Sequence, residues 1–301
     1  MKFFKISPES NEDLKVNREK FEIARLQNPN LHQNDICYGI CPYCDSPVQL
    51  LGIFRKIETK PYGKHCGKDI PNVGRHHQSV FEYCPYNSHK RAVSKTDRRK
   101  DVTERDIKIY NLIKEHFDQI IYILKKDCDV YISHGRARKI LEMAKIRTVW
   151  QYPEIDEANL PWIILYLYDE INIYGQYIRI DSELHKALIK HNIKFEPEDK
   201  VKGFVRVGKQ DKNITWNYSF AIHKRYVNKD GCFKEYIKAV VTKPNLNGLV
   251  KIYEKKIPIN HQRFYNLMNS ENAPKYRNEE LLKIAQEVFS DELKLTQQIP
   301  D

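Results

Sequence analysis

The chain has 301 residues, of which 41% are hydrophobic and 30% are charged. This balance supplies enough apolar side chains for a packed core and excludes a chain that is disordered throughout. The longest uninterrupted apolar run, residues 160–168, is far too short to cross a bilayer, and the polar residues that follow Lys5 leave no room for an apolar secretory segment. We therefore expect a cytoplasmic protein with no membrane partner.

The charge of the chain is strongly positive, because 51 lysines and arginines outnumber 40 acidic residues and give a net charge of +11. The excess lies in three segments: 84–100 with a net charge of +5, 133–147 with +4, and 200–256 with +10. A positive surface favours a polyanionic partner, most commonly nucleic acid, although lysines on a solvated face also serve solubility. The pattern leaves open whether the partner is DNA or RNA.

The first hundred residues combine one helical pattern with a segment rich in cysteine, histidine, proline and glycine. Apolar residues recur at helical spacing over 10–28, and Pro29 ends that pattern. Two short strands are predicted further on, at 48–54 and 79–83. The glycines and prolines of 61–74 predict a loop between these strands.

Helical periodicity dominates the middle of the chain. The predicted helices cover residues 103–124, 133–144, 159–175 and 182–191. Ser133 and Ser182 are N-caps, because a serine hydroxyl can accept a hydrogen bond from the first turn of a helix. Pro161 fits the first turn of the third helix, where its missing N–H would have no partner.

After residue 196 the pattern changes to strands. The predicted strands cover 201–207, 214–226, 232–241 and 249–258, and two helices follow at 260–269 and 277–294. The run Asn-Lys-Asp-Gly at 228–231 predicts a hairpin turn, because asparagine and glycine tolerate positive φ. Trp216, Tyr218 and Phe220 share one face of their strand, and we expect this face to form the core of the sheet.

The cysteines carry the strongest chemical signal in the sequence. Their odd number, seven, argues against a disulfide framework. The run Cys-Pro-Tyr-Cys at 41–44 is a knuckle that can chelate one ion from a tight turn, and Cys-Pro-Tyr recurs at 84–86. The spacing predicts one structural Zn²⁺ per chain, held by Cys41, Cys44, Cys84 and His89. The fourth ligand stays open among His89, Cys66 and the histidines of 65–77.

These patterns together predict an α+β fold in three parts. A zinc-knuckle module with a basic C-terminal run covers residues 1–100, and a helical domain covers 101–195. An antiparallel sheet with C-terminal helices covers 196–301.

The histidines beside the knuckles resemble parts of the HNH nuclease family. In that family a ββα hairpin, often clamped by zinc knuckles, uses one histidine as general base and others to hold a metal on the phosphate. The resemblance implies a metal-dependent nuclease with His76, His77 and Asn87 in its site. It covers only residues 37–90, and Asn87 stands where the second knuckle would have its second cysteine.

Basic residues near the knuckle and in the middle of the chain are the predicted contacts to nucleic acid. They are Lys90, Arg91, Lys95, Arg98, Arg99 and Lys100 after the second knuckle, and Arg136, Arg138 and Lys139 at a helix start. No glycine-rich phosphate loop, serine elbow or HExxH motif is present, so we expect no catalytic site. The sequence favours a zinc-stabilised, intracellular nucleic-acid-binding protein; the alternatives are the nuclease and a protein-interaction adapter with a structural zinc.

Overall fold

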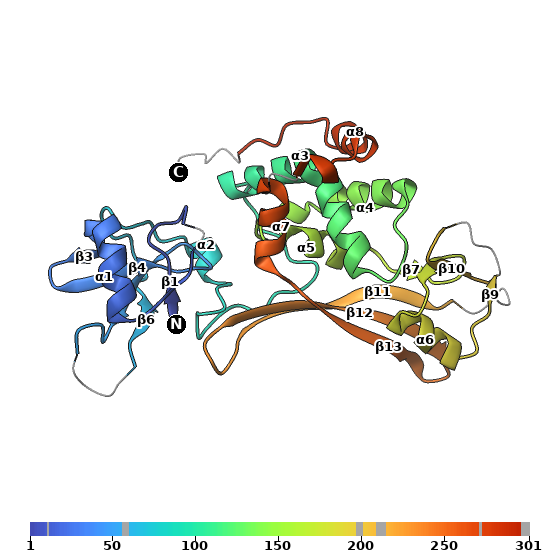
Figure 1. Cartoon of the computed structure of the whole chain (residues 1–301), viewed down its shortest axis with the longest axis horizontal. Coiled ribbons are helices and arrows are strands. Elements are labelled where there is room, and N and C mark those ends of the chain that lie inside the picture. The colour runs from blue at the N-terminus through green and yellow to red at the C-terminus, as the bar shows by residue number, and fades with distance from the viewer. Residues whose placement is uncertain (11, 56–59, 197–200, 209–214, 271–272, 296–301) are drawn as a thin grey trace. The chain divides into compact units, whose positions relative to one another are not determined.

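The computed structural model describes the chain except for residues 11, 56–59, 197–200, 209–214, 271–272 and 296–301. It has the mixed α+β fold predicted from the sequence, with antiparallel sheets (Figure 1). The chain divides into two compact units, Met1–Ser94 with Arg225–Lys234, and Lys95–Lys224 with Glu235–Asp301. The helical segment and the C-terminal sheet, which the sequence assigns to separate domains, therefore fall in one unit.

The first unit consists of short strands and helices. In chain order its elements are β1 (Phe3–Phe4), β2 (Leu14–Lys15), α1 (Arg18–Gln27), η1 (Pro29–Leu31), β3 (His32–Gln33), β4 (Ile36–Ile40), β5 (Pro47–Leu51), β6 (Tyr62–His65) and α2 (Gln78–Phe81). Strands β3, β4, β5 and β6 form one antiparallel sheet in that order, and β1 pairs with β2.

Three local predictions in this unit need correction. The first helix starts at Arg18 rather than at residue 10, because the Asn17 side chain caps it by accepting a hydrogen bond from the Lys20 N–H (2.8 Å). Residues 78–81 form α2 rather than a strand, since the backbone bonds close within the segment, from the Phe81 N–H to the His77 carbonyl (2.8 Å). The predicted loop 61–74 contains β6, which pairs with β5.

The core of the first unit is continuous with its cysteines. Phe4 and Phe21 are fully buried, and their ring centroids lie 6.5 Å apart. Cys41, Cys44 and Cys84 belong to the same cluster of buried residues. A ligand bound by these three thiols would therefore lie at the core of this unit.

Helices form most of the first half of the second unit and also close the chain. They are α3 (Glu104–Asp127), α4 (His134–Ile146), η2 (Val149–Gln151), α5 (Leu160–Tyr166), α6 (Glu183–Lys190), α7 (His261–Asn269), η3 (Ala273–Tyr276) and α8 (Glu279–Val288). Ser133 and Ser182 cap α4 and α6 as predicted, accepting hydrogen bonds from backbone N–H groups at 3.2 and 3.1 Å. Thr103 and Asp106 form a capping box at the start of α3. Helix α5 ends earlier than predicted, because the chain turns into the strand β7 (Ile171–Asn172).

No helix in the part of the chain that the structure describes is both long and apolar enough to span a membrane.

Two antiparallel sheets complete the second unit, in the strand orders β13-β12-β11-β7 and β8-β10-β9. The strands after β7 are β8 (Tyr177–Arg179), β9 (Phe195–Glu196), β10 (Phe204–Val207), β11 (Asn217–Val227), β12 (Phe233–Asn245) and β13 (Gly248–Pro258). The predicted strand start at residue 214 lies outside the described residues. Trp216, Tyr218 and Phe220 are buried, as predicted.

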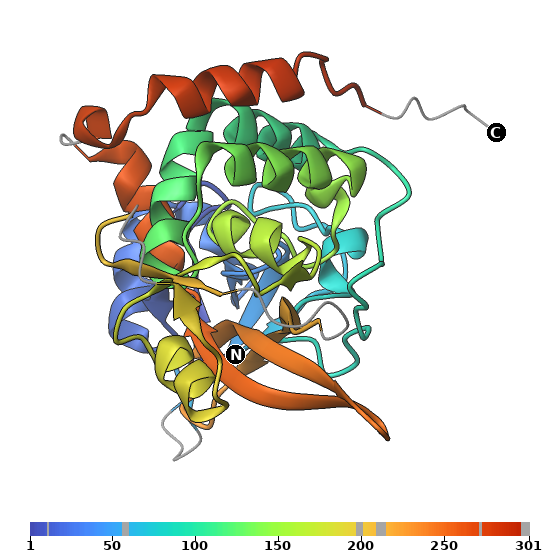
Figure 2. The same ribbon diagram turned by 90° about the vertical axis from the view of Figure 1, so that its right-hand side faces the viewer.

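Helices α3, α4, α5 and α8 of the second unit lie on one side of its long sheet, and α8 lies along α3 and α4 (Figures 1 and 2). The tip of the β11–β12 hairpin, residues 225–234, belongs to the first unit. Its turn forms as predicted: Gly231 has a φ of 77°, and its N–H donates to the Asn228 carbonyl (2.9 Å).

Candidate metal centre

Three cysteines and one histidine of the first unit converge on one point. The ligand atoms of Cys41, Cys44, His65 and Cys84 all lie within 4.8 Å of one another. The Sγ atoms of Cys41 and Cys84 are 3.7 Å apart. The Nε2 atom of His65 lies 3.3 Å from Sγ of Cys44 and 3.7 Å from Sγ of Cys84.

The distances of 3.3 to 3.7 Å match the edges of a tetrahedron around a metal ion. With zinc–sulfur bonds of about 2.3 Å and zinc–nitrogen bonds of about 2.0 Å, tetrahedral geometry places two sulfurs about 3.8 Å apart and a sulfur and a nitrogen about 3.5 Å apart. Three thiolates and one imidazole form a soft donor set, which suits zinc better than magnesium or calcium. The four residues therefore fit a tetrahedral metal ion whose positions are all filled by the protein.

Local backbone hydrogen bonds present each ligand. Cys41 follows β4, and its N–H donates to the Ser46 carbonyl (2.9 Å), which closes the turn of the knuckle. His65 is the last residue of β6. Cys84 follows α2, and its N–H donates to the Phe81 carbonyl (3.0 Å). A strand end and two turns thus position the donor atoms.

Burial and mutual contact control the protonation of the thiols in the absence of metal. Burial raises the pKa of Cys41 and the pKa of Cys84. The pKa of Cys44 is lowered instead, because hydrogen bonds from Cys41, Cys84 and His65 stabilise its thiolate. Burial therefore favours the protonated forms of Cys41 and Cys84, whose protons a bound cation would displace.

The fourth member of this group is His65, not His89. His89 is exposed, and its N–H donates to Oδ1 of Asn87 (3.0 Å). Cys66, another alternative left open by the sequence, also lies outside the group, and its N–H donates to the Pro47 carbonyl (3.0 Å). His65 does belong to the loop histidines that the sequence left as alternatives.

The strand β6 explains why the sequence favoured His89. Glycine and proline around this segment predict a loop, whereas pairing with β5 makes it a strand. Within it, exposed Tyr62 and Lys64 alternate with buried Gly63 and half-buried His65. This alternation directs His65 inward, but the residues Tyr-Gly-Lys-His do not reveal it, because the aromatic residue is the exposed one.

The histidines predicted for a nuclease have other contacts. Nε2 of His76 lies 2.9 Å from Oε1 of Gln78, and His77 is the N-cap residue of α2. The side chain of Asn87 donates to the Phe81 carbonyl (3.3 Å). None of the three belongs to the Cys/His group found among the described residues.

The tyrosine inside the knuckle packs against the hairpin tip that belongs to the same unit. The guanidinium of Arg225 lies over the ring of Tyr43 at 4.0 Å and over the ring of Phe233 at 5.3 Å, and it donates a hydrogen bond to the Tyr43 hydroxyl. The Nζ of Lys90 donates to the Arg225 carbonyl (3.0 Å). These contacts join the knuckle to residues 225–234, so a disturbance of one segment is expected to disturb the other.

Three of the cations predicted to contact nucleic acid are instead bound within the second unit. Arg99, whose side chain is 8% exposed, donates to the Trp150 carbonyl (2.7 Å) and forms an ion pair with the buried Asp106. Arg98 donates to a backbone carbonyl at 2.5 Å, and Lys95 donates to two carbonyls at 3.3 Å each. Burial lowers the pKa of both Lys95 and Arg98. These side chains satisfy backbone carbonyl groups of their own unit.

The remaining predicted contacts differ in their surroundings. Arg138 forms an ion pair with Glu287, and Arg136 donates to Gln176. The exposed ones are Lys90, Arg91, Lys100 and Lys139.

A second group of titratable side chains lies in the second unit. The buried carboxylate of Glu235 lies 2.6 Å from Nε2 of His223 and 2.5 Å from Nε2 of His261, and it accepts a hydrogen bond from Asn159 (2.8 Å). Nδ1 of His223 lies 3.2 Å from the carboxylate of Glu154. These residues come from distant parts of the chain, so no short motif revealed them.

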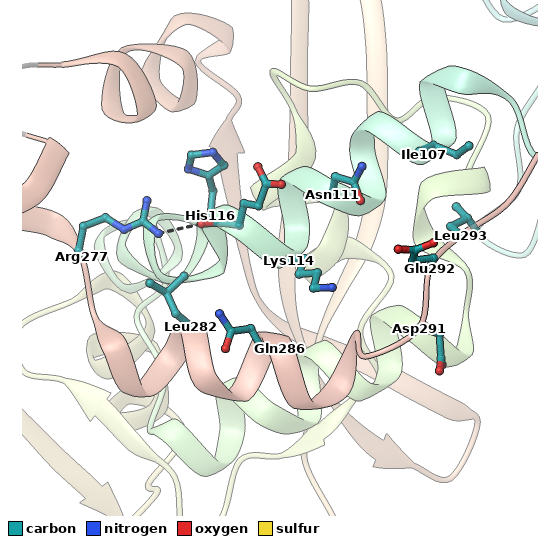
Figure 3. Close-up of a pocket in the computed structure, with 11 residues that line it drawn as sticks. Ile107, Asn111, Lys114, His116, Arg277, Leu282, Gln286, Asp291, Glu292 and Leu293 are labelled. Carbon is teal, nitrogen blue, oxygen red and sulfur yellow. Dashed lines mark hydrogen bonds between the residues drawn. The ribbon is translucent and has the colours of Figure 1, made fainter.

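A cleft of about 710 Å³ opens beside α3 and α8 (Figure 3). Helix α3 departs from helical geometry at His116 (φ −127°, ψ 21°), and Arg277 donates to the Glu115 carbonyl there (2.8 Å). Both signs of charge line the cleft, with Lys114 and Arg277 on one hand and acidic side chains such as Glu292 on the other. Because both signs of charge are present, the lining does not indicate whether a ligand would be an anion or a cation.

Comparison with protein-family models, with curated proteins and with solved structures finds no match for this chain. A functional assignment therefore depends on its residues and their geometry.

Proposed function

We propose that this chain is a nucleic-acid-binding protein whose first unit is stabilised by one structural Zn²⁺, held by Cys41, Cys44, His65 and Cys84. The observation that supports the ion most directly is the Cys₃His group at tetrahedral spacing. Because the protein supplies all four donors, the ion has no open position for water or substrate, as in structural zinc sites.

The first unit has little regular secondary structure, so a bound ion would contribute much of its stability. Its strands are only two to five residues long. Structural zinc contributes about 10–16 kcal/mol in zinc-finger peptides, which equals or exceeds the total stability of an ordinary small domain. The metal would therefore decide whether this unit folds.

Metal analysis of the protein purified without chelator tests this part of the proposal. We expect one zinc per chain, and we expect Cys44→Ser to lose it while Cys66→Ser, outside the group, retains it. A protein without zinc, or equal loss in both variants, would refute the assignment.

The solvent side of the β12–β13 hairpin supports the nucleic-acid part of the proposal. On one face of these strands Ile237, Val241 and Ile257 are buried. Side chains alternate between the faces, so Lys238 and its cross-strand partner Lys256 point the other way.

The charge of this outer face is positive. Lys238 and Lys251 both donate to Glu254, and the ammonium of Lys256 lies over the ring of Tyr236 at 4.1 Å. Two lysines thus share one carboxylate, and a third lies over an aromatic ring. Phosphates favour such a surface because each cation that they meet releases a counterion, and exposed rings can stack on bases.

A salt titration of oligonucleotide binding tests this surface. By fluorescence anisotropy on single- and double-stranded DNA and RNA, we expect affinity to fall steeply with salt. Replacing Lys238, Lys251 and Lys256 together by alanine should reduce the log–log slope by about 2 to 3. The matched triple substitution of Lys186, Lys275 and Lys283, which are exposed and lie outside the sheet, should leave it unchanged.

The same experiment separates the other two functions considered for the sequence. An adapter would show little affinity for any oligonucleotide at near-physiological salt and would bind an acidic protein instead. A nuclease would cleave the oligonucleotide on addition of Mg²⁺ or Mn²⁺ and would lose cleavage in His76→Ala or His77→Ala. Either result would overturn the proposal.

A further inference from the structure

A small cavity in the second unit lies where α4, α5, β7 and β11 meet. Its volume is about 20 Å³, which is room for one water molecule or one ion of similar size. Its walls are mostly apolar and include Val130, Ile132, Ile140, Leu165 and Phe220.

Arg136, on the first turn of α4, brings a cation to this cavity. Its Nη2 donates to Oε1 of Gln176. Its Nη1 is buried and has no hydrogen-bond partner among the residues that the structure describes. Burial lowers the pKa of Arg136, yet a guanidinium stays charged at neutral pH, so a positive charge persists beside apolar walls.

The other polar residues that line the cavity do not neutralise this charge. Asp169 is the acidic residue among them, and it forms an ion pair with Arg147. Burial raises the pKa of Tyr168, so its hydroxyl stays neutral at pH 7. A water molecule would satisfy Nη1 but would leave this half-buried guanidinium without a counter-ion.

We propose that this cavity binds one monatomic halide anion, chloride under physiological conditions, against Nη1 of Arg136. The anion satisfies both the donor and the charge. A monatomic anion fits this site better than phosphate or sulfate, because the space is water-sized and most of the walls are apolar. The bound anion would fix α4 to the sheet at β7 and β11.

Thermal unfolding of the zinc-loaded full chain tests the proposal at constant pH and ionic strength, with chloride exchanged for methanesulfonate. Chloride at about 100 times its dissociation constant should raise the ratio of folded to unfolded protein about 100-fold. Arg136→Met keeps the volume and removes the charge, so it should abolish this dependence. Arg138→Met, at an ion pair on the surface of the same helix, should retain it.

A crystal grown or soaked in bromide gives a second readout that does not depend on any variant folding. We expect an anomalous peak within hydrogen-bonding reach of Nη1 of Arg136. Solvent density there without an anomalous peak would mean water only and would overturn the proposal. Equal chloride dependence in the wild-type chain and in Arg136→Met would overturn it as well.

Discussion

Replacing His65 by alanine should weaken zinc binding, whereas the same change at His89 should not. His65 places Nε2 at 3.3 Å from Sγ of Cys44 and 3.7 Å from Sγ of Cys84, while His89 is exposed and lies outside the group. The two variants remove the same side chain from the same cysteine-rich segment. They therefore compare the histidine that the fold places in the Cys/His group with the histidine favoured by the sequence spacing.

The expected magnitude follows from the four-donor geometry. If zinc contributes about 12 kcal/mol, within the range for small zinc modules, each donor accounts for about 3 kcal/mol. Loss of one donor then lowers zinc affinity by roughly two orders of magnitude, since each 1.4 kcal/mol is about a factor of ten. His65→Cys should recover most of the affinity, because a thiolate can occupy the same corner of the tetrahedron.

Competition with a chromophoric chelator measures these affinities, and circular dichroism reports whether each variant folds when zinc is in excess. We expect the wild type, His89→Ala and His65→Cys to have similar zinc affinities. We expect His65→Ala to bind zinc far more weakly. Weak binding in His89→Ala together with normal binding in His65→Ala would refute the assignment of the fourth ligand.

Three further predictions concern protonation and burial. Because burial raises the pKa of Cys41 and of Cys84, zinc binding should release about two protons, and zinc affinity should rise roughly 100-fold per unit from pH 7 to 8; a chelator competition independent of pH in that range would contradict this. Arg99→Ala should destabilise the second unit by about 3–5 kcal/mol in urea unfolding, because Asp106 is left buried without its cation, and a folded variant should keep the wild-type salt slope of nucleic-acid binding. His223→Ala should destabilise the second unit by about 1.5–3 kcal/mol, because the buried carboxylate of Glu235 loses one hydrogen-bond partner while His261 and Asn159 remain; a change below about 1 kcal/mol would show that the contacts of His223 are dispensable.

Features that depend on near neighbours in the chain were predictable from residues alone. Ser133 and Ser182 cap helices where predicted, since a cap needs only a hydroxyl and an N–H three residues on. The hairpin turn ending at Gly231 formed for the same local reason. The period-two aromatics that include Tyr218 are buried as predicted, because alternation alone places them on one face.

Features that depend on long-range pairing were decided only by the tertiary structure. Cys41 and Cys84 could be identified from the repeated Cys-Pro-Tyr, but the choice of His65 over His89 required β6 to pair with β5, which glycine and proline in the segment concealed. The basic run after the second knuckle had the composition of a binding surface. In the structure, however, the guanidinium of Arg99 is bound to backbone carbonyls and to a carboxylate of its own unit. Charge along a sequence reports how many cations exist, whereas packing determines which of them solvent and a partner can reach.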